Sequence, residues 1–313
     1  MERINSNLLK ELIKVRGTSG DESRIKDFIL KYIEENKANW KSPVTIYEGE
    51  NFQDAIVLVF GQPKTAVFAH IDTIGYMVGY NNSLMKIGSP VNIDTARLVG
   101  SDSKGKIETE LMMMEHPFGQ TQLKCLCERE IDRGTILTYK PRFIQKETYI
   151  QSPYLDNRLG VLNALHLAEG LENGAIVFST YEEHGGGSVG FLAKFLFEKY
   201  GTRQALISDI TWVTDGIKHG EGVVISMRDQ HIPRRSYLNQ LIAIAKENNI
   251  QFQLEVESAG GSDGSYLQKS NFPFDWCFVG APESNAHTPK EKVYISDIVE
   301  MMKFYEIIMN KIG

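Results

Sequence analysis

The strongest constraint on the fold is the alternation of apolar, strand-like runs with amphipathic segments along most of the chain. Helical spacing of apolar residues predicts two helices within residues 5–35, and further helices at 159–171, 189–199, 237–248 and 296–309. Strands are expected at 55–60, 65–70, 74–80, 175–181, 204–210, 252–257 and 275–279. Strands that alternate with helices indicate an α/β fold, with one sheet covered on both faces.

Residues 81–150 differ in character from the rest. This stretch has short alternating runs separated by turn residues and no long amphipathic segment. We interpret it as a small, β-rich, barrel-like domain inserted into the main domain. The predicted domains are therefore residues 1–80 together with 151–313, and the insertion at 81–150.

Composition excludes several classes of protein. The chain of 313 residues has 34 Lys and Arg against 40 Asp and Glu, a net charge of −6, which argues against a nucleic-acid partner. No apolar run approaches the roughly 20 residues of a membrane span, and the first residues lack the apolar core of a signal peptide. We therefore expect no membrane or nucleic-acid partner. The three cysteines suggest a reducing, cytoplasmic location.

Two short patterns predict local structure. Ser19-Gly-Asp-Glu22 has the spacing of a capping box, in which Ser19 would cap the second helix and Glu22 would reach back to it. Cys125 and Cys127 are alternate residues of an apolar run, so we expect two buried thiols on one face of a strand.

Two adjacent glutamates, Glu182 and Glu183, follow the apolar run 175–181 and precede three glycines. Like charges at the mouth of a buried strand raise each other's pKa, and burial raises it further. A cation between them removes that cost. The pair therefore indicates a metal site, with a solvated strand end as the alternative.

Further polar residues follow other predicted strands. His70 ends one run, and Asp72 shares its face on an extended chain, so its carboxylate is placed to hold the second ring nitrogen of the histidine. Asp156 precedes a predicted helix, Asp209 ends a strand and His287 lies in a late loop. Taken singly, each has a plain alternative: a polar turn, a helix N-cap or an exposed loop residue.

Taken together, these residues form a set of nitrogen and oxygen ligands suited to zinc, cobalt or manganese. His70, Asp156, Asp209, His287 and the glutamate pair provide more ligands than one tetrahedral ion needs. The count favours two ions that share a bridging carboxylate.

At this point the chain resembles a known family, the tetrahedral aminopeptidases, which include glutamyl and leucyl deblocking aminopeptidases, some of them labelled as cellulases. The similarity extends over nearly the whole chain. Its motifs are Gly17-Thr-Ser-Gly20, Ala69-His-Ile-Asp-Thr-Ile-Gly-Tyr-Met-Val78, Leu155-Asp-Asn-Arg-Leu-Gly160, Glu182-Glu183, Ser208-Asp-Ile-Thr211, Gly260-Gly-Ser-Asp263 and His287.

The resemblance implies a three-layer doubly wound mixed sheet of the zinc-exopeptidase type, with a β-rich insertion. It implies an aminopeptidase that uses two divalent ions, most simply zinc, with cobalt or manganese as alternatives. Short peptides would be the substrates and a homo-oligomer the assembly. The roles implied are listed here by position: His70 and Asp209 on one metal, Glu183 and His287 on the other, Asp156 as bridge, Asp72 as the residue that orients His70, and Glu182 as general base.

The family also has a cis peptide bond after the bridging aspartate, which we expect at Asp156–Asn157. Two segments depart from its pattern. Asn157 stands where the family usually has Asp, and Ser284-Asn285-Ala286 stands where Arg-Tyr often precedes the late histidine. Three alternatives stay open: a metal-dependent carboxypeptidase or deacylase, a glycosidase, and a catalytically decayed relative.

Overall fold

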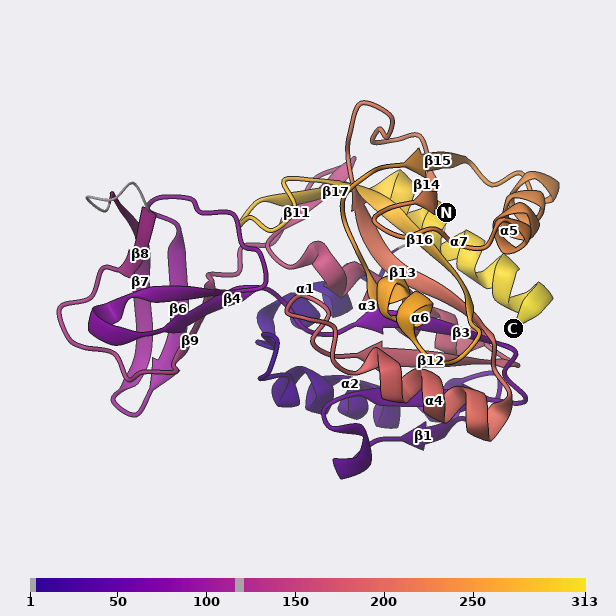
Figure 1. The fold of residues 1–313 in the computed structure, drawn as a ribbon, viewed down its shortest axis with the longest axis horizontal. Coiled ribbons are helices and arrows are strands. Elements are labelled where there is room, and N and C mark those ends of the chain that lie inside the picture. The colour runs from indigo at the N-terminus through magenta and orange to yellow at the C-terminus, as the bar shows by residue number, and fades with distance from the viewer. Residues whose placement is uncertain (1–3, 116–120) are drawn as a thin grey trace.

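The computed structural model describes residues 4–115 and 121–313. Its larger part is built on a mixed sheet of eleven strands (Figure 1). Along the sheet the order is β1 (Thr45–Tyr47), β2 (Ile56–Phe60), β12 (Gly174–Ser179), β3 (Thr65–His70), β13 (Gln204–Trp212), β16 (Asp275–Ser284), β17 (Glu291–Tyr294), β11 (Tyr149–Ser152) and β10 (Ile144–Gln145), with β14 (Val223–Arg228) beside β16 and β15 (Phe252–Val256) beside β14.

Helices cover both faces of this sheet. One face carries α1 (Ser6–Lys14), α2 (Ser23–Asn36), α3 (Leu155–Gly170), α5 (Arg235–Glu247) and α7 (Ile295–Ile312), and the other carries α4 (Val189–Tyr200) and α6 (Asp263–Lys269). All five residues of β2 are buried. Ile56, Leu58 and Phe60 join one apolar core and Val57 and Val59 the other, because successive side chains of a strand point to opposite faces. The predicted three-layer doubly wound mixed sheet is confirmed.

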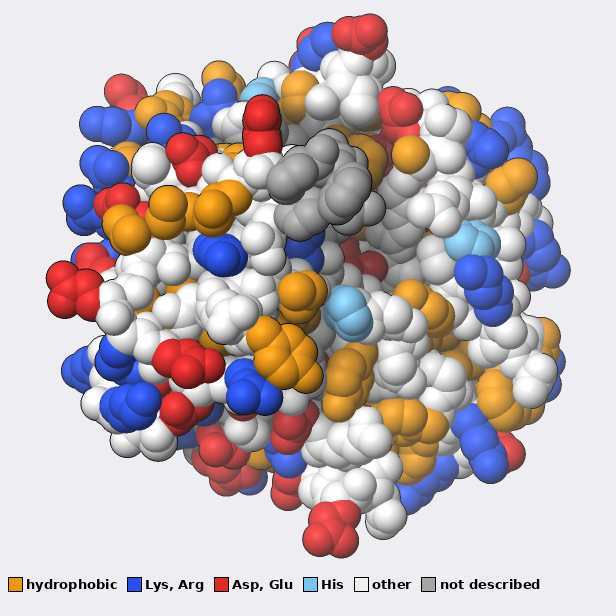
Figure 2. Space-filling view, turned by 60° about the vertical axis from the view of Figure 1, so that its left-hand side comes forward, with side chains coloured by type: hydrophobic (Ala, Val, Ile, Leu, Met, Phe, Trp, Pro, Cys, Tyr) orange, Lys and Arg blue, Asp and Glu red, His pale blue; other side chains and the backbone are white. Residues whose placement is uncertain are grey.

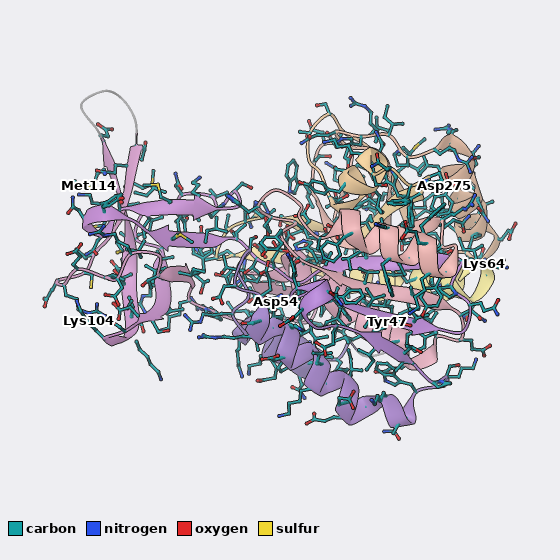
Figure 3. The ribbon with its side chains drawn as sticks, turned by 60° about the horizontal axis from the view of Figure 1, so that its bottom comes forward. Tyr47, Asp54, Lys64, Lys104, Met114 and Asp275 are labelled. Atoms are coloured by element: carbon teal, nitrogen blue, oxygen red, sulfur yellow. The ribbon has the colours of Figure 1, made fainter. Side chains whose placement is uncertain are left out.

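A second sheet extends from one side of this body (Figure 1). Its six strands are antiparallel, in the order β5 (Leu84–Ile87), β4 (Gly75–Val78), β9 (Ile136–Tyr139), β6 (Arg97–Asp102), β7 (Gly105–Glu115) and β8 (Thr121–Cys125). It has an apolar core of its own. Figure 3 places Lys104 and Met114 on this sheet, far from Lys64 and Asp275 on the main body. The division of the chain near residues 80 and 150 stays a prediction.

Several local predictions were wrong in detail. Ser19 does not cap α2, whose N-cap residue, Glu22, makes no side-chain capping bond. The Ser19 hydroxyl instead donates to Asp72 Oδ2 over 2.5 Å, a charge-assisted hydrogen bond to a buried carboxylate. Cys125 is buried in β8, but Cys127 lies beyond the strand and is only half-buried.

A short helix, α6, which was not predicted, begins within Gly260–Gly264. Ser262 and Ser265 form a capping box at the start of that helix. The helix has only seven residues, too few to give a clear apolar periodicity in the sequence. Among the described residues, no helix has both the length and the apolarity that a bilayer crossing demands.

Candidate metal centre

The candidate site lies where four parallel strands end. β12, β3, β13 and β16 are parallel neighbours, so their carboxyl ends meet at one edge of the sheet. His70 is the last residue of β3 and pairs in register with Ser179 of β12, while Asp209 lies near the end of β13. In open α/β sheets this edge is where ligands bind.

The structure brings all five predicted metal ligands together in two groups. His70, Asp156 and Asp209 form one, and Asp156, Glu183 and His287 form the other; within each group the ligand atoms lie within 4.8 Å of one another. Nε2 of His70 is 3.1 Å from Asp156 Oδ1 and 3.5 Å from Asp209 Oδ2. Nε2 of His287 is 3.3 Å from both Asp156 Oδ2 and Glu183 Oε2. The two oxygens of Asp156 thus face different histidines.

The backbone that carries Asp156 is held on both sides. The Asp156–Asn157 peptide bond is cis, as expected from the resemblance. Asn157, at the position that departs from the family pattern, donates through Nδ2 to the Ser208 carbonyl (2.8 Å) and accepts from Gly160 N (2.8 Å). Asp156 N donates to Glu291 Oε2 (3.3 Å). Asn157 therefore ties the start of α3 to β13, the strand that carries Asp209.

Asp72 makes more contacts at the site than the sequence predicted. Its Oδ1 lies 3.4 Å from His70 Nδ1, and the expected orienting role of Asp72 stays a prediction. It also accepts the backbone N–H groups of Glu182 and Glu183, each over 3.1 Å. One fully buried carboxylate thus fixes the loop after β12 and contacts the histidine of β3. The spacing of these residues in the sequence gave no signal of this link.

A serine next to the inserted sheet holds His287. Ser89 Oγ lies 2.8 Å from His287 Nδ1. The same nitrogen is 3.2 Å from the Ser89 carbonyl oxygen, and because a carbonyl oxygen can only accept, Nδ1 must carry the proton in that hydrogen bond. Donation from Nδ1 leaves Nε2 with its lone pair directed at the carboxylates. Ser89 was missed because nothing in the sequence links it to a loop almost 200 residues away. His184, which directly follows the glutamate pair, accepts from Gly88 N through Nδ1 (3.0 Å).

Burial and mutual repulsion govern the protonation of the site. Burial is the largest cause that raises the pKa of Glu182 and Glu183 well above the usual value, and neighbouring carboxylates raise it further. Burial likewise raises the pKa of Asp209 to about 6. Burial also acts to raise the pKa of Asp156, but contacts with His287 and His70 outweigh it and lower that pKa. Without a cation, the two glutamates therefore favour the protonated form, whereas a nearby cation would favour their ionised form.

The residues fit divalent cations. Glu183 Oε1 is buried and makes no hydrogen bond within the described residues, so this polar atom has no partner of the protein's own. Two imidazole nitrogens and several carboxylate oxygens are ligands that zinc, cobalt and manganese accept. The same arrangement gives the like-charged glutamates a cation to face, which removes the cost of placing them together.

The cluster opens into a cavity of about 440 Å³, lined by Asp156, Glu182, Glu183, Asp209 and His287 together with residues of β13, β15 and the segment after β14. Figure 2 shows a hollow near the middle of the face it displays, with acidic side chains deep inside. The candidate centre is thus accessible to a ligand from outside the protein.

A three-layer mixed sheet, with an inserted antiparallel sheet and a cluster of histidines and carboxylates at its strand ends, defines a protein of the zinc-exopeptidase fold class. A profile described as M42 glutamyl aminopeptidase matches residues 99–304, more than half of the chain. The chain belongs to the M42 glutamyl aminopeptidase family, and therefore to the peptidases.

The individual relatives have low sequence identity to this chain. A protein of Acetivibrio thermocellus named "Putative aminopeptidase" is 24% identical over 326 residues, which cover 95% of this chain and 96% of the relative. An aminopeptidase from the archaeon Desulfurococcus kamchatkensis has a TM-score of 0.83 at 19% identity, with 97% of this chain and 93% of that chain covered. The Pyrococcus horikoshii TET1 peptidase, described as able to assemble into a tetrahedron or a large octahedral shell, has a TM-score of 0.80 at 20% identity, covering 97% and 98%. These structures show that the fold is shared.

Proposed function

We propose that this chain is a metal-dependent aminopeptidase that removes N-terminal residues from short peptides. The observation that carries the proposal is the position of Asp156, whose two carboxylate oxygens each face a different histidine-containing group. A carboxylate placed in this way suits a bridge between two cations. Family membership supports the peptidase activity.

In this proposal His70 and Asp209 hold one divalent ion, Glu183 and His287 hold the other, and Asp156 is shared. Zinc suits this ligand set, with cobalt or manganese as alternatives. When bound, such ions supply a Lewis acid for the peptide carbonyl and lower the pKa of water. Asp72 contacts His70 at the end of β3 and accepts the amides of both glutamates, so it positions one proposed ligand of each ion.

Glu182 is the proposed general base. Its Oε2 lies 4.0 Å from His70 Nε2, so it faces the cluster, yet it belongs to neither ligand group. A carboxylate so placed takes the proton of the attacking water and returns it to the amine that leaves. The backbone amides of the consecutive residues Glu182 and Glu183 both donate to the Asp72 carboxylate, while their side chains take different roles.

The test is Glu182→Gln, which preserves shape and removes the base. We expect unchanged content of bound metal and a loss of turnover of aminoacyl-anilides by about 10²–10⁴-fold. Glu198→Gln makes the same chemical change at an exposed site on α4 and should behave as wild type. Near-wild-type turnover by Glu182→Gln would remove the base assignment.

Substrate class is tested separately. Aminoacyl-anilides should be cleaved and acyl-amino acids should not, and chelation should abolish the cleavage. Activity on acyl-amino acids would instead favour a deacylase or carboxypeptidase. A glycosidase would need two carboxylates and no metal, so glycoside cleavage that survives chelation would support that alternative.

We also propose a homo-oligomer, supported by the assembly described for the Pyrococcus horikoshii TET1 peptidase. Light scattering of the purified chain measures its mass directly, and a mass of one chain would contradict this part of the proposal.

A further inference from the structure

The cavity continues beyond the candidate metal centre along β13. Asp209 and Thr211 are alternate residues of that strand, so their side chains point to the same face, about 7 Å apart along the chain. The Thr211 hydroxyl donates to Glu255 of β15, and both residues line the cavity. Glu255 therefore stands one long side chain away from the metal ligands.

Two carboxylates at this far end of the cavity are buried, and each accepts a hydrogen bond through only one of its two oxygens. Asp229 is 8% exposed and Glu255 is 5% exposed, and both line the cavity. Oδ1 of Asp229 accepts the His231 N–H (2.6 Å), and Oε1 of Glu255 accepts from Thr211. The hydrogen bonds within the described residues use only one oxygen of each carboxylate, although Ser226 on β14 lies beside Glu255 and lowers its pKa. The second oxygens, on side chains that line the cavity, are therefore placed to accept from a ligand.

The balance of charge at this end is negative. Glu257 also lines the cavity, which gives three carboxylates against the exposed Lys269 and His231. Arg228, whose charge also acts on Asp229, donates to the Glu257 carbonyl (2.6 Å) and does not line the cavity. Burial raises the pKa of Glu255, and the nearby Asp229 and Glu257 add to that effect. A cation that entered between Asp229 and Glu255 would relieve the repulsion, whereas a carboxylate would increase it.

We infer that this end of the cavity binds the side chain of the substrate's N-terminal residue and selects lysine or arginine. The inference rests on the proposed aminopeptidase function and adds the class of residue removed. Both side chains carry their positive charge on a long apolar stem, which matches an acidic end separated from the reaction centre. This preference differs from the glutamyl specificity in the family's description.

The test compares lysine with norleucine, which has the same four-carbon stem and no charge. Metal-loaded protein is assayed with the anilides of lysine, arginine, norleucine and glutamate. We expect kcat/KM for lysine to exceed that for norleucine about ten-fold or more, since a buried charge-assisted hydrogen bond is made only by lysine. Glutamate should be the poorest substrate. Norleucine or glutamate cleaved as well as lysine would overturn the inference and leave the aminopeptidase function intact.

Variants assign the effect to residues. Glu255→Gln keeps an oxygen for Thr211 and removes the charge, and Asp229→Asn does the same for the amide of His231. Each should lower the ratio of lysine to norleucine kcat/KM several-fold, while Glu198→Gln should leave it unchanged. If both variants kept the wild-type ratio, the subsite would be wrongly placed.

A binding measurement separates this inference from the proposed function. Calorimetric titration of metal-loaded protein with lysinamide and norleucinamide needs no turnover. Binding of lysinamide about ten-fold tighter than norleucinamide supports the acidic subsite even if no anilide is cleaved. The absence of cleavage would contradict the proposed function and leave the subsite in place. Equal binding of the two amides overturns the inference.

Discussion

Gly160 offers a sharp test of how closely α3 must approach β13. A Cβ atom added there would lie 2.0 Å from the Ser208 carbonyl oxygen and 2.2 Å from Asn157 Oδ1. An ordinary contact begins near 3.4 Å, so the helix and the strand would have to separate by about 1.4 Å (3.4 − 2.0). Both neighbours belong to fixed structure, because Asn157 is itself bonded to the Ser208 carbonyl.

The expected cost of Gly160→Ala follows from three contributions. Overpacking of a well-ordered core costs about 1–3 kcal/mol, and sometimes more. Loss of the hydrogen bond from Asn157 to Ser208 adds about 1 kcal/mol. Alanine in place of glycine within a helix returns about 1 kcal/mol. The last two effects cancel, so the free energy of unfolding should fall by about 1–3 kcal/mol.

The same displacement acts on the candidate centre. Asp156 lies in the first turn of α3 and Asp209 lies on β13, so separating the two elements moves two proposed ligands of one ion apart. Zinc affinity should weaken about 10-fold or more, the range found when supports of metal ligands are disturbed. Urea unfolding of metal-free protein and zinc titration measure the two effects independently.

Gly170→Ala is the matched control. Gly170 ends the same helix, and a Cβ there would meet nothing within 4 Å. We expect stability equal to wild type or up to about 1 kcal/mol higher, with zinc affinity unchanged. If Gly160→Ala matched this control in both measurements, the close approach of α3 to β13 would not be what positions Asp156.

Three further predictions concern other parts of the molecule. Chelation of wild-type protein should lower its unfolding transition, by about 2.7 kcal/mol relative to metal at 100 times its Kd; an unchanged thermal scan would contradict the metal centre. Burial lowers the pKa of His219 from 6.5 to about 4. The unfolded chain then takes up this proton first, so stability should fall as pH drops from about 6.5 toward 4; urea midpoints of His219→Gln should show a shallower pH dependence, and an identical slope would refute this. Asp297, fully buried, accepts the amides of Gly220 (2.8 Å) and Gly222 (3.0 Å). Asp297→Asn can accept only one, which should cost about 1–3 kcal/mol in chemical denaturation; wild-type stability would mean that the second amide finds another acceptor.

Periodicity was sufficient for the larger elements. Buried runs such as Ile56–Phe60 and amphipathic runs such as α5 gave the α/β class, because burial of an apolar face imposes the period of the element on the sequence. Periodicity did not predict the short or irregular elements. α6 begins at a capping box of two serines, and β16 runs five residues past its predicted end because neighbouring strands continue to pair with it.

The candidate ligands could be named from the sequence because each lies near the end of a predicted strand, in the loop after one or at the start of a helix. Their supports could not. Ser89, Glu291 and the double role of Asp72 depend on contacts between segments far apart in the chain. Such contacts leave no period or spacing in the sequence.

By itself, then, the sequence determined the class of fold, the resemblance to aminopeptidases and which side chains are candidates for metal binding. Only the tertiary structure decided that the two oxygens of Asp156 face different histidines, that Asp72 holds both glutamate amides, and that Asp229 and Glu255 lie in the same cavity as the metal centre. The physical reason is that local patterns record which face of an element is buried. Distances between elements depend on how α3, the inserted sheet and the strand ends pack together, and that packing is set by the whole chain at once.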